Sequence, residues 1–189
     1  MRVIAGKFRS RPLRSLRGMD LRPTADRLRE TLFNVLGAGN PGAFEGSVWL
    51  DLCAGTGAVG IEALSRGASK AYFVESSSAA ASLIRQNLDS LGLAEGFEVI
   101  KDDVSHALPK LEARKVTANF IFLDPPYSLE KVYVQVLQLL SQSSLLAPDA
   151  VVVVEHDKRF DPGDGFAPLR RYRTLEQGEA VLSFYRLTR

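Results

Sequence analysis

The sequence predicts an α/β protein in which a mostly parallel sheet carries helices on both faces. A short apolar run over residues 48–52 has strand length, and a glycine-rich turn joins it to a helical pattern that begins at Ile61. Further runs of strand length alternate with helical patterns along the body, and two β-rich runs close the chain. Such alternation is typical of a doubly wound sheet, and the final pair indicates an antiparallel hairpin at its edge.

The N-terminal region, residues 1–21, is predicted to form a small appendage to the main domain. Residues 1–21 alternate apolar and basic side chains in places and contain Gly6, Pro12 and Gly18, which favours a short β-hairpin or an extended arm. Thr24 is placed to cap a helix, and the cluster at 39–42 ends it. We therefore expect an arm over 1–21 and one main domain over 22–189.

The body then supplies the remaining strands and helices. Strands are expected at 70–75, 97–100, 120–123 and 151–154, followed by a hairpin of 169–174 with 181–187. A helix should begin near Ser76–Ser78 and end at Gly92, and a later helix carries Val132 and Val136 on its apolar face. The expected order is therefore strand and helix in alternation.

Composition limits the classes of protein that fit. The 189 residues are 46% hydrophobic and can bury one substantial core. No run approaches the length of a membrane span, and no apolar segment follows the basic N-terminus as in an export signal. The single cysteine, Cys53, excludes an intramolecular disulfide, and neither histidine has partners at metal-ligand spacing. We expect a cytoplasmic protein without a bound metal or a membrane contact.

Charge is divided unevenly along the chain. Residues 1–29 carry nine basic and two acidic side chains, a net charge of +7 that leaves −5 for the rest of a chain with +2 overall. Such a division indicates that the N-terminal piece meets a polyanion. The side chains best placed to contact RNA phosphates are Arg2, Lys7, Arg9, Arg11 and Arg14.

The glycine turn has two possible ligands. The spacing Gly55-x-Gly57-x-x-Gly60 matches the dinucleotide fingerprint, in which a pyrophosphate rests on a helix N-terminus. Asp51 stands four residues before Gly55, and its carboxylate would repel a pyrophosphate. A cationic ligand, with an ammonium and a sulfonium, suits this position better.

Two stretches resemble known families. The run from Asp51 to Gly57 resembles motif I of the class I, S-adenosylmethionine-dependent methyltransferases. The leader, 2–13 with 21–34, is similar to that of the bacterial small-subunit (16S) rRNA guanine-N2 methyltransferase family. The resemblance implies a seven-stranded mixed sheet, S-adenosylmethionine as methyl donor with S-adenosylhomocysteine as product, and a monomer. It also implies 16S rRNA as the substrate, within a 30S subunit or an assembly intermediate.

The same resemblance assigns the cofactor site. Glu75, at the tip of the second strand, would accept hydrogen bonds from both ribose hydroxyls. An acid after the third strand would accept from the adenine amino group; Asp103 is preferred because Val104 follows it, and Asp102 stays an alternative. Arg22 and Thr24 match the family's Arg-Pro-Thr. The expected cofactor contacts are Asp51, Cys53, Ala54, Gly55, Gly57, Glu75 and Asp103.

The tetrapeptide Asp124-Pro125-Pro126-Tyr127 carries the expected chemistry. Two prolines stiffen the backbone and remove two N–H donors. The segment resembles the tetrapeptide of methyltransferases that act on exocyclic amino groups of bases. The Asp124 carboxylate and the Pro125 carbonyl would accept from the amine and localise its lone pair, while Tyr127 would stack on the base.

Two other functions compete with this interpretation. Asp-Pro-Pro-Tyr is also common in adenine-N6 methyltransferases that act on DNA or RNA, although a duplex reader normally needs a larger recognition region than the roughly 50 residues outside the expected sheet. A non-catalytic RNA-binding protein with a residual cofactor fold is the second competitor. The complete set of Asp51, Glu75, Asp103 and Asp124 argues against it.

Overall fold

The computed structural model describes residues 1–15 and 23–188, and within them eight strands form one sheet. The helices are α1 (Pro23–Leu36), α2 (Ala58–Ser65), α3 (Ser78–Ser90), α4 (Val104–Ala113) and α5 (Glu130–Gln142). The strands are β1 (Val48–Leu52), β2 (Lys70–Glu75), β3 (Phe97–Lys101), β4 (Ala118–Leu123), β5 (Leu146–Asp157), β6 (Gly165–Phe166), β7 (Leu169–Gln177) and β8 (Ala180–Leu187).

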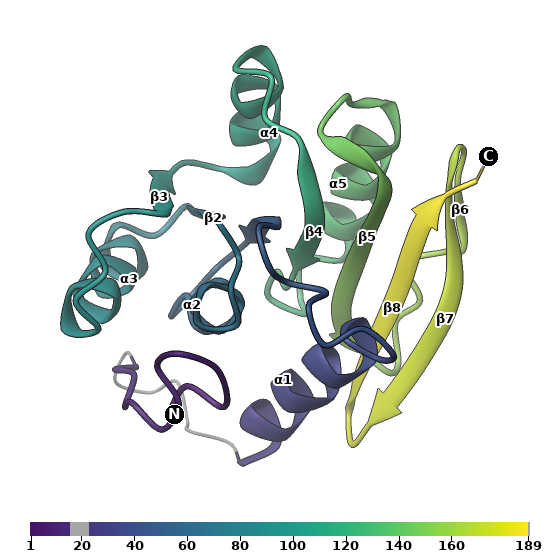
Figure 1. Cartoon of the computed structure of the whole chain (residues 1–189). Coiled ribbons are helices and arrows are strands. Elements are labelled where there is room, and N and C mark those ends of the chain that lie inside the picture. The colour runs from purple at the N-terminus through teal and green to yellow at the C-terminus, as the bar shows by residue number, and fades with distance from the viewer. Residues whose placement is uncertain (16–22, 189) are drawn as a thin grey trace.

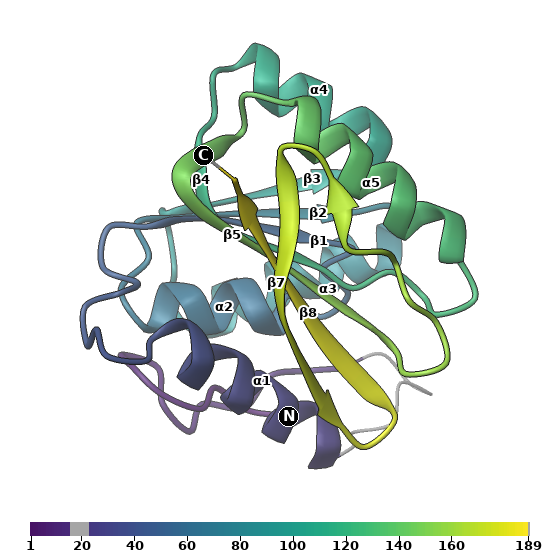
Figure 2. The same cartoon turned by 90° about the vertical axis from the view of Figure 1, so that its right-hand side faces the viewer.

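The sheet separates two helical layers (Figures 1 and 2). Its strand order is β3-β2-β1-β4-β5-β8-β7-β6, parallel from β3 to β5 and antiparallel beyond. On one face α1, α2 and α3 pack over a core that includes Trp49 and Phe73. On the other face α4 and α5 pack over a second core that includes Leu50 and Val152. Alternate residues of one strand therefore enter different cores.

The chain reverses its direction of growth between β1 and β4. From β1 it proceeds outward through β2 and β3, then returns to place β4 on the other side of β1. A crevice opens outside the carboxyl ends of the strands at such a switch point, and ligands of doubly wound sheets bind there. In this chain Asp51 lies on β1 and Asp124 follows β4 directly. Topology alone brings these two acids to one edge.

The alternating fold predicted from the sequence is confirmed, with differences in detail. The described residues form eight strands where seven were expected, because the two-residue β6 pairs with β7. It is too short to leave a periodic signal. The expected strand at 151–154 is the centre of the twelve-residue β5, whose pairing with β4 shifts register between Ala118 and Phe120. Helix α4 was not foreseen, because its apolar pattern is short and contains Pro109.

The N-terminal residues form a closed loop on α2. Backbone hydrogen bonds join Val3 N to Arg11 O at 2.9 Å and Leu13 N to Met1 O at 3.1 Å, and a single β-bridge pairs Arg2 with Pro12. Val3, Leu13 and the buried Phe8 belong to the same core as α1 and α2. Residues 1–15 are thus packed into the main body. The rest of the expected arm, with Arg22 of the Arg-Pro-Thr match, lies outside the described residues, as does the side chain of Thr24.

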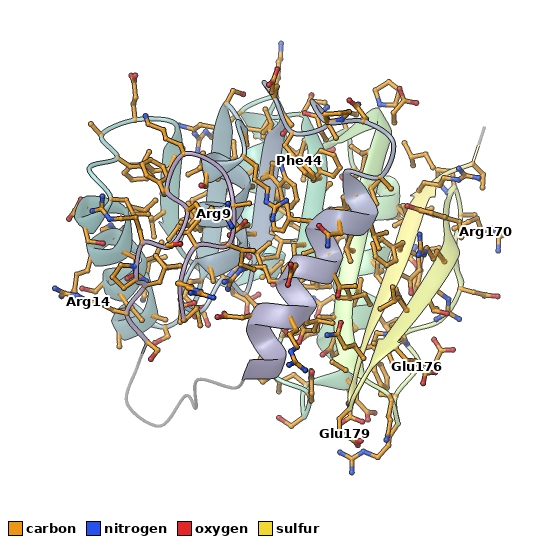
Figure 3. All side chains as sticks on the ribbon, turned by 60° about the horizontal axis from the view of Figure 1, so that its bottom comes forward. Arg9, Arg14, Phe44, Arg170, Glu176 and Glu179 are labelled. Carbon is orange, nitrogen blue, oxygen red and sulfur yellow. The ribbon has the colours of Figure 1, made fainter. Side chains whose placement is uncertain are left out.

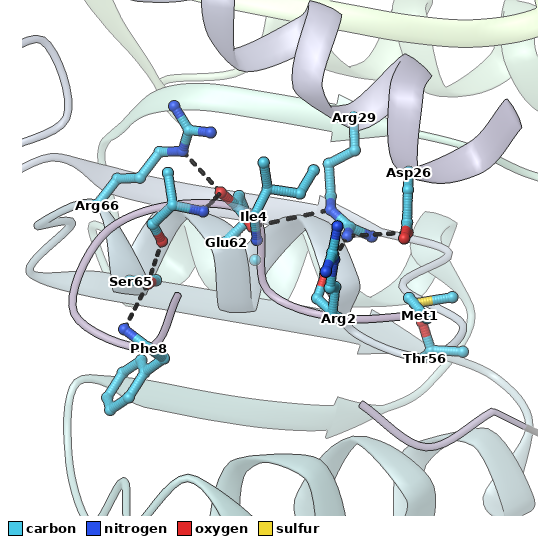
Figure 4. Close-up of polar contacts among 12 residues, drawn as sticks. Met1, Arg2, Ile4, Phe8, Asp26, Arg29, Thr56, Glu62, Ser65 and Arg66 are labelled. Carbon is cyan, nitrogen blue, oxygen red and sulfur yellow. Dashed lines mark hydrogen bonds and ion pairs between the residues drawn. The ribbon is translucent and has the colours of Figure 1, made fainter. Parts of the chain in front are cut away.

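A buried carboxylate holds this loop in place (Figure 4). Glu62 of α2 is fully buried and accepts from the backbone N–H groups of Ile4 and Ala5 at 2.8 and 2.9 Å. It also accepts from Arg66 Nε at 2.8 Å, and Arg29 Nε lies 3.8 Å away. Because an ion buried without partners costs several kcal/mol, the backbone donors and both arginines make this position tenable.

Candidate active site

A cavity of about 800 Å³ opens at the carboxyl ends of the parallel strands. This size suits a nucleoside-sized ligand. Of the residues expected to bind the cofactor or to act on the base, all but Gly57 line it. The lining residues from that prediction are Asp51, Cys53, Ala54, Gly55, Glu75, Asp103, Asp124, Pro125, Pro126 and Tyr127.

The glycine turn has an unusual backbone. Cys53, Gly55 and Gly57 adopt φ angles of 62°, 55° and 76°, in the left-handed region. A non-glycine residue there is uncommon, and such strain concentrates at functional sites. Gly57 caps α2 instead of lining the cavity. A Cβ on Gly60 would lie 2.4 Å from Phe73 Cε1, so this glycine permits close packing of α2 on the sheet.

Asp51 is buried next to the glycine turn and forms a hydrogen bond with the first turn of α2. The side chain is 2% exposed, and its Oδ2 accepts from the Gly60 N–H at 2.9 Å. Burial raises the pKa of Asp51 to about 7; the Gly60 hydrogen bond opposes the rise, and the nearby Glu75 charge adds to it. A carboxylate held in this way gains from a cationic neighbour, since a positive charge offsets the cost of its ionisation.

Glu75 connects the turn to the next helix. One oxygen accepts from Gly55 N at 2.9 Å and the other from Ser77 N at 2.8 Å. Each carboxylate oxygen has a second lone pair, so both can still accept from a ligand. Ser77 in turn caps α3, its Oγ accepting from Ala80 N at 3.3 Å. The carboxylate is therefore fixed in a geometry suited to two adjacent hydroxyls.

The two acids after β3 have different partners. Asp103 is the N-cap of α4 and accepts from Ser105 N at 2.8 Å and Ser105 Oγ at 2.6 Å. The hydrogen bond from the Ser105 hydroxyl is the main reason that its pKa is lowered. Asp102 pairs with Lys110 at 2.6 Å. Both acids line the cavity, so the adenine contact stays a prediction for Asp103 with Asp102 as the alternative.

Two hydrogen bonds hold the Asp124–Tyr127 segment in place after β4. Asp124 N donates to Leu52 O at 3.2 Å, and Tyr133 of α5 donates its hydroxyl to Pro125 O at 3.1 Å. The Pro125 carbonyl keeps one lone pair for another donor. Burial raises the pKa of the Asp124 carboxyl well above its usual range, and the neighbouring Glu155 charge raises it further. Tyr127 is 38% exposed and lies at the cavity.

Two charged residues that line the cavity, Glu155 and Arg29, escaped the sequence analysis. Glu155 lies on β5 beside Asp124 and accepts from the Tyr127 hydroxyl at 3.3 Å. The signal was present, because Glu155 directly follows the apolar run 151–154 as the other acids follow theirs. Arg29 of α1 is 5% exposed and donates to Arg2 O at 2.5 Å. Nothing in the helical pattern marks Arg29 as buried, since its partners come from the loop and α2.

The basic side chains proposed for RNA contact lie outside the cavity. All five are exposed on the N-terminal loop, and Figure 3 shows Arg9 and Arg14 on one side of the molecule, with Arg170 of β7 on the other. Arg11 donates to Ser90 O at 2.7 Å and Arg14 to Gln86 Oε1 at 3.3 Å, so both side chains contact α3. Their role in RNA binding stays a prediction.

The acidic side chains around the cavity suit a cationic organic ligand. Carboxyl groups from the tips of β1, β2, β4 and β5 line it, and Cys53, whose pKa is raised to about 12 chiefly by burial, is a neutral thiol there. Within the described residues, no group of three or more His, Cys, Asp or Glu side chains is placed to hold a metal. Likewise, no helix among them is both long and apolar enough to span a membrane.

Known proteins resemble this chain over nearly its whole length. Ribosomal RNA small subunit methyltransferase D of Haemophilus influenzae is 38% identical over 159 residues, which are 84% of this chain and 79% of that protein. YlbH of Bacillus subtilis, named as a candidate rRNA methyltransferase, is 34% identical over 186 residues, 98% of both chains. The structure of yhhF from Escherichia coli, titled as a candidate methyltransferase, matches with a TM-score of 0.81 at 29% identity, covering 100% of this chain and 99% of that one.

These likenesses confirm the class I methyltransferase fold expected from the sequence. Residues 1–186 match the family described as Conserved hypothetical protein 95. The match includes the N-terminal loop, the glycine turn and the Asp124–Tyr127 segment. This chain therefore belongs to the Conserved hypothetical protein 95 family, the methyltransferase family of the small-subunit ribosomal RNA methyltransferase D proteins.

Proposed function

We propose that this protein transfers a methyl group from S-adenosylmethionine to the exocyclic N2 amino group of a guanine in small-subunit rRNA. The observation that carries the proposal is the meeting of the glycine turn and the Asp124–Tyr127 segment in one acid-lined cavity. The names of the relatives support rRNA as the substrate. An enzyme on this substrate acts in the cytoplasm, and we expect a monomer that meets the rRNA in a 30S subunit or its precursor.

The bound donor would supply a methyl group activated by a sulfonium. Glu75 would orient the ribose, and either Asp103 or Asp102 would orient the adenine. The negative charge of Asp51, which also holds the glycine turn, would stabilise the positive charge of the donor. Cys53, Ala54 and Gly55 would contact the donor mainly through their backbone. Alignment of the reacting atoms accounts for much of the acceleration in such a displacement.

The Asp124–Tyr127 segment would bind the base that receives the methyl group. An exocyclic amine is a poor nucleophile because its lone pair is delocalised into the ring. Asp124 would accept from one amine N–H and Pro125 O from the other, drawing the nitrogen toward a tetrahedral geometry. Pro126 keeps this backbone rigid, and Tyr127 would stack on a base turned out of its helix. The raised pKa of Asp124 suits a group that also takes the proton released after transfer.

The experiment compares possible acceptors directly. Purified protein is incubated with methyl-labelled S-adenosylmethionine and 30S subunits, bare small-subunit rRNA or duplex DNA. Label in rRNA that digests to N2-methylguanosine supports the proposal. Label in DNA, or in N6-methyladenosine, would support the adenine-N6 alternative. RNA binding with no transfer to any acceptor would favour the non-catalytic alternative.

A further inference from the structure

Glu155 and Asp124 form a pair of carboxyl groups on neighbouring strands. Leu123 of β4 pairs with Val154 of β5, so the next residues on each strand are also neighbours. Adjacent strands lie about 4.7–4.9 Å apart. Phe122 and Val153 enter the core beneath α1 and α2, and strand alternation sends Asp124 and Glu155 to this same face. Both line the cavity, so two acceptors stand side by side where the base is proposed to enter.

Glu155 has capacity to accept a further hydrogen bond. Among the described residues its carboxylate accepts one, from the Tyr127 hydroxyl to Oε1 at 3.3 Å. Its Oε2 has no hydrogen-bond partner in that part of the chain. No cation lies in an ion pair with it there either, in contrast to Asp102 with Lys110. Glu155 lines the cavity, so this oxygen is open to a ligand and can accept a hydrogen bond from it.

The edge of guanine matches this pair of acceptors. Guanine carries an N1–H donor directly beside its N2 amino group, whereas adenine has an N1 acceptor beside its N6 amino group. A guanine that places its amine at Asp124 and turns N1, not N3, toward β5 would bring N1–H to Glu155. A carboxylate there would bond to guanine and would oppose the lone pair of adenine N1.

We propose that Glu155 selects the base by accepting a hydrogen bond from guanine N1–H while Asp124 engages the adjacent amino group. This inference rests on the proposed function and specifies how its site distinguishes guanine from adenine. Tyr127 takes part twice, since its hydroxyl orients Glu155 and its ring is proposed to stack on the base. A base contact of this type typically changes discrimination about 10- to 100-fold.

The test uses 2-aminopurine, which keeps the amino group of guanine but has an acceptor at N1. The methylated guanosine is first located by mass spectrometry in rRNA treated with the wild-type protein. A synthetic segment with guanosine or 2-aminopurine riboside at that position is then ligated into small-subunit rRNA and reconstituted into 30S particles. kcat/KM is measured for both substrates with the wild type, with Glu155→Gln and with Glu176→Gln, a matched change at an exposed position on β7.

The wild type should prefer guanosine by about 10-fold or more. Glu155→Gln should reduce that preference by about 10-fold, because a rotated amide can donate to N1, and should leave the dissociation constant of S-adenosylmethionine within about twofold. Glu176→Gln should behave as the wild type. A wild type that accepts both bases equally overturns the proposal without any variant, and so does an unchanged preference in Glu155→Gln. Absence of transfer to any rRNA would instead refute the proposed function.

Discussion

Glu62 Oε2 accepts a hydrogen bond from the backbone N–H of Ile4 at 2.8 Å, joining positions 58 residues apart in the sequence. This contact fixes the N-terminal loop to helix α2. The same carboxylate lies near Arg29, whose side chain lines the cavity, so the loop and the active site share a polar network. The position of the basic loop relative to the cavity therefore depends on Glu62.

Replacing Glu62 by alanine should lower the free energy of unfolding by about 3–5 kcal/mol, because Arg29 and two backbone N–H groups would lose their buried partner. Urea unfolding followed by circular dichroism measures the change. The control is Glu98→Ala, which breaks the exposed ion pair with Arg114 and should cost about 1 kcal/mol or less. Equal effects of the two substitutions would show that the Glu62 network adds nothing beyond a surface pair.

Asp51→Asn should make the protein more stable at pH 8 than the wild type. Burial raises the pKa of Asp51 to about 7 from an unfolded value of about 4, so the native state binds the proton more tightly. The Asp51 contribution to the free energy of unfolding therefore falls as pH rises from about 4 to about 7, by up to about 4 kcal/mol. The amide oxygen can still accept from Gly60.

Urea titrations at pH 5 and pH 8 measure this effect as the difference between variant and wild type. That difference should be larger at pH 8. The same variant should bind S-adenosylmethionine at least about tenfold more weakly, because the negative charge that favours the sulfonium is gone. A stability difference independent of pH would contradict the burial argument, and unchanged affinity would contradict the role of Asp51 in cofactor binding.

Gly60→Ala should destabilise the protein by about 1–3 kcal/mol despite the better helix propensity of alanine. The added Cβ would meet the Phe73 ring at 2.4 Å, and overpacked cores cost about this much. Thermal melting reports the loss. In the double variant with Phe73→Leu the cost of the alanine should shrink, since the clashing ring atoms are removed. If both backgrounds lose the same stability, the close approach is not the cause.

Arg9→Gln should weaken binding to small-subunit rRNA and reduce its dependence on salt. A side chain that neutralises one phosphate contributes about 0.7–0.9 to the slope of log K against log salt concentration. Filter binding at several salt concentrations gives this slope. The control is Arg170→Gln on the opposite side of the molecule (Figure 3). Equal slopes for Arg9→Gln, Arg170→Gln and the wild type would exclude Arg9 as a phosphate contact.

Local patterns were enough to predict the main elements and all the acidic residues of the cavity except Glu155. The bounds of β1 and β2 follow from short apolar runs, and the acids that end them fall in the cavity because parallel strands share one edge. The Asp124 segment was found through its two prolines. These signals lie within a few neighbouring residues, which a single sequence displays directly.

What escaped prediction depends on contacts between distant parts of the chain. Glu62 is the one charged residue of α2, and its burial is made possible by backbone donors from the distant residues Ile4 and Ala5. Asp103 was expected only as a ligand contact, whereas its Oδ1 also caps α4 by accepting from Ser105 N. Gly57 and Gly60 were noticed because they belong to a ligand-binding motif. In the structure Gly57 adopts a left-handed φ, and Gly60 allows α2 to pack closely on Phe73.

The most direct test of the central claim follows one nucleoside in 30S subunits prepared from cells that lack the gene. The subunits are incubated with S-adenosylmethionine and either the wild-type protein or Asp124→Ala, then digested and analysed by mass spectrometry. The wild type should add N2-methylguanosine, and Asp124→Ala should be slower by about 10²-fold or more at unchanged cofactor affinity. Equal turnover by the two proteins, or no N2-methylguanosine from the wild type, would contradict the account.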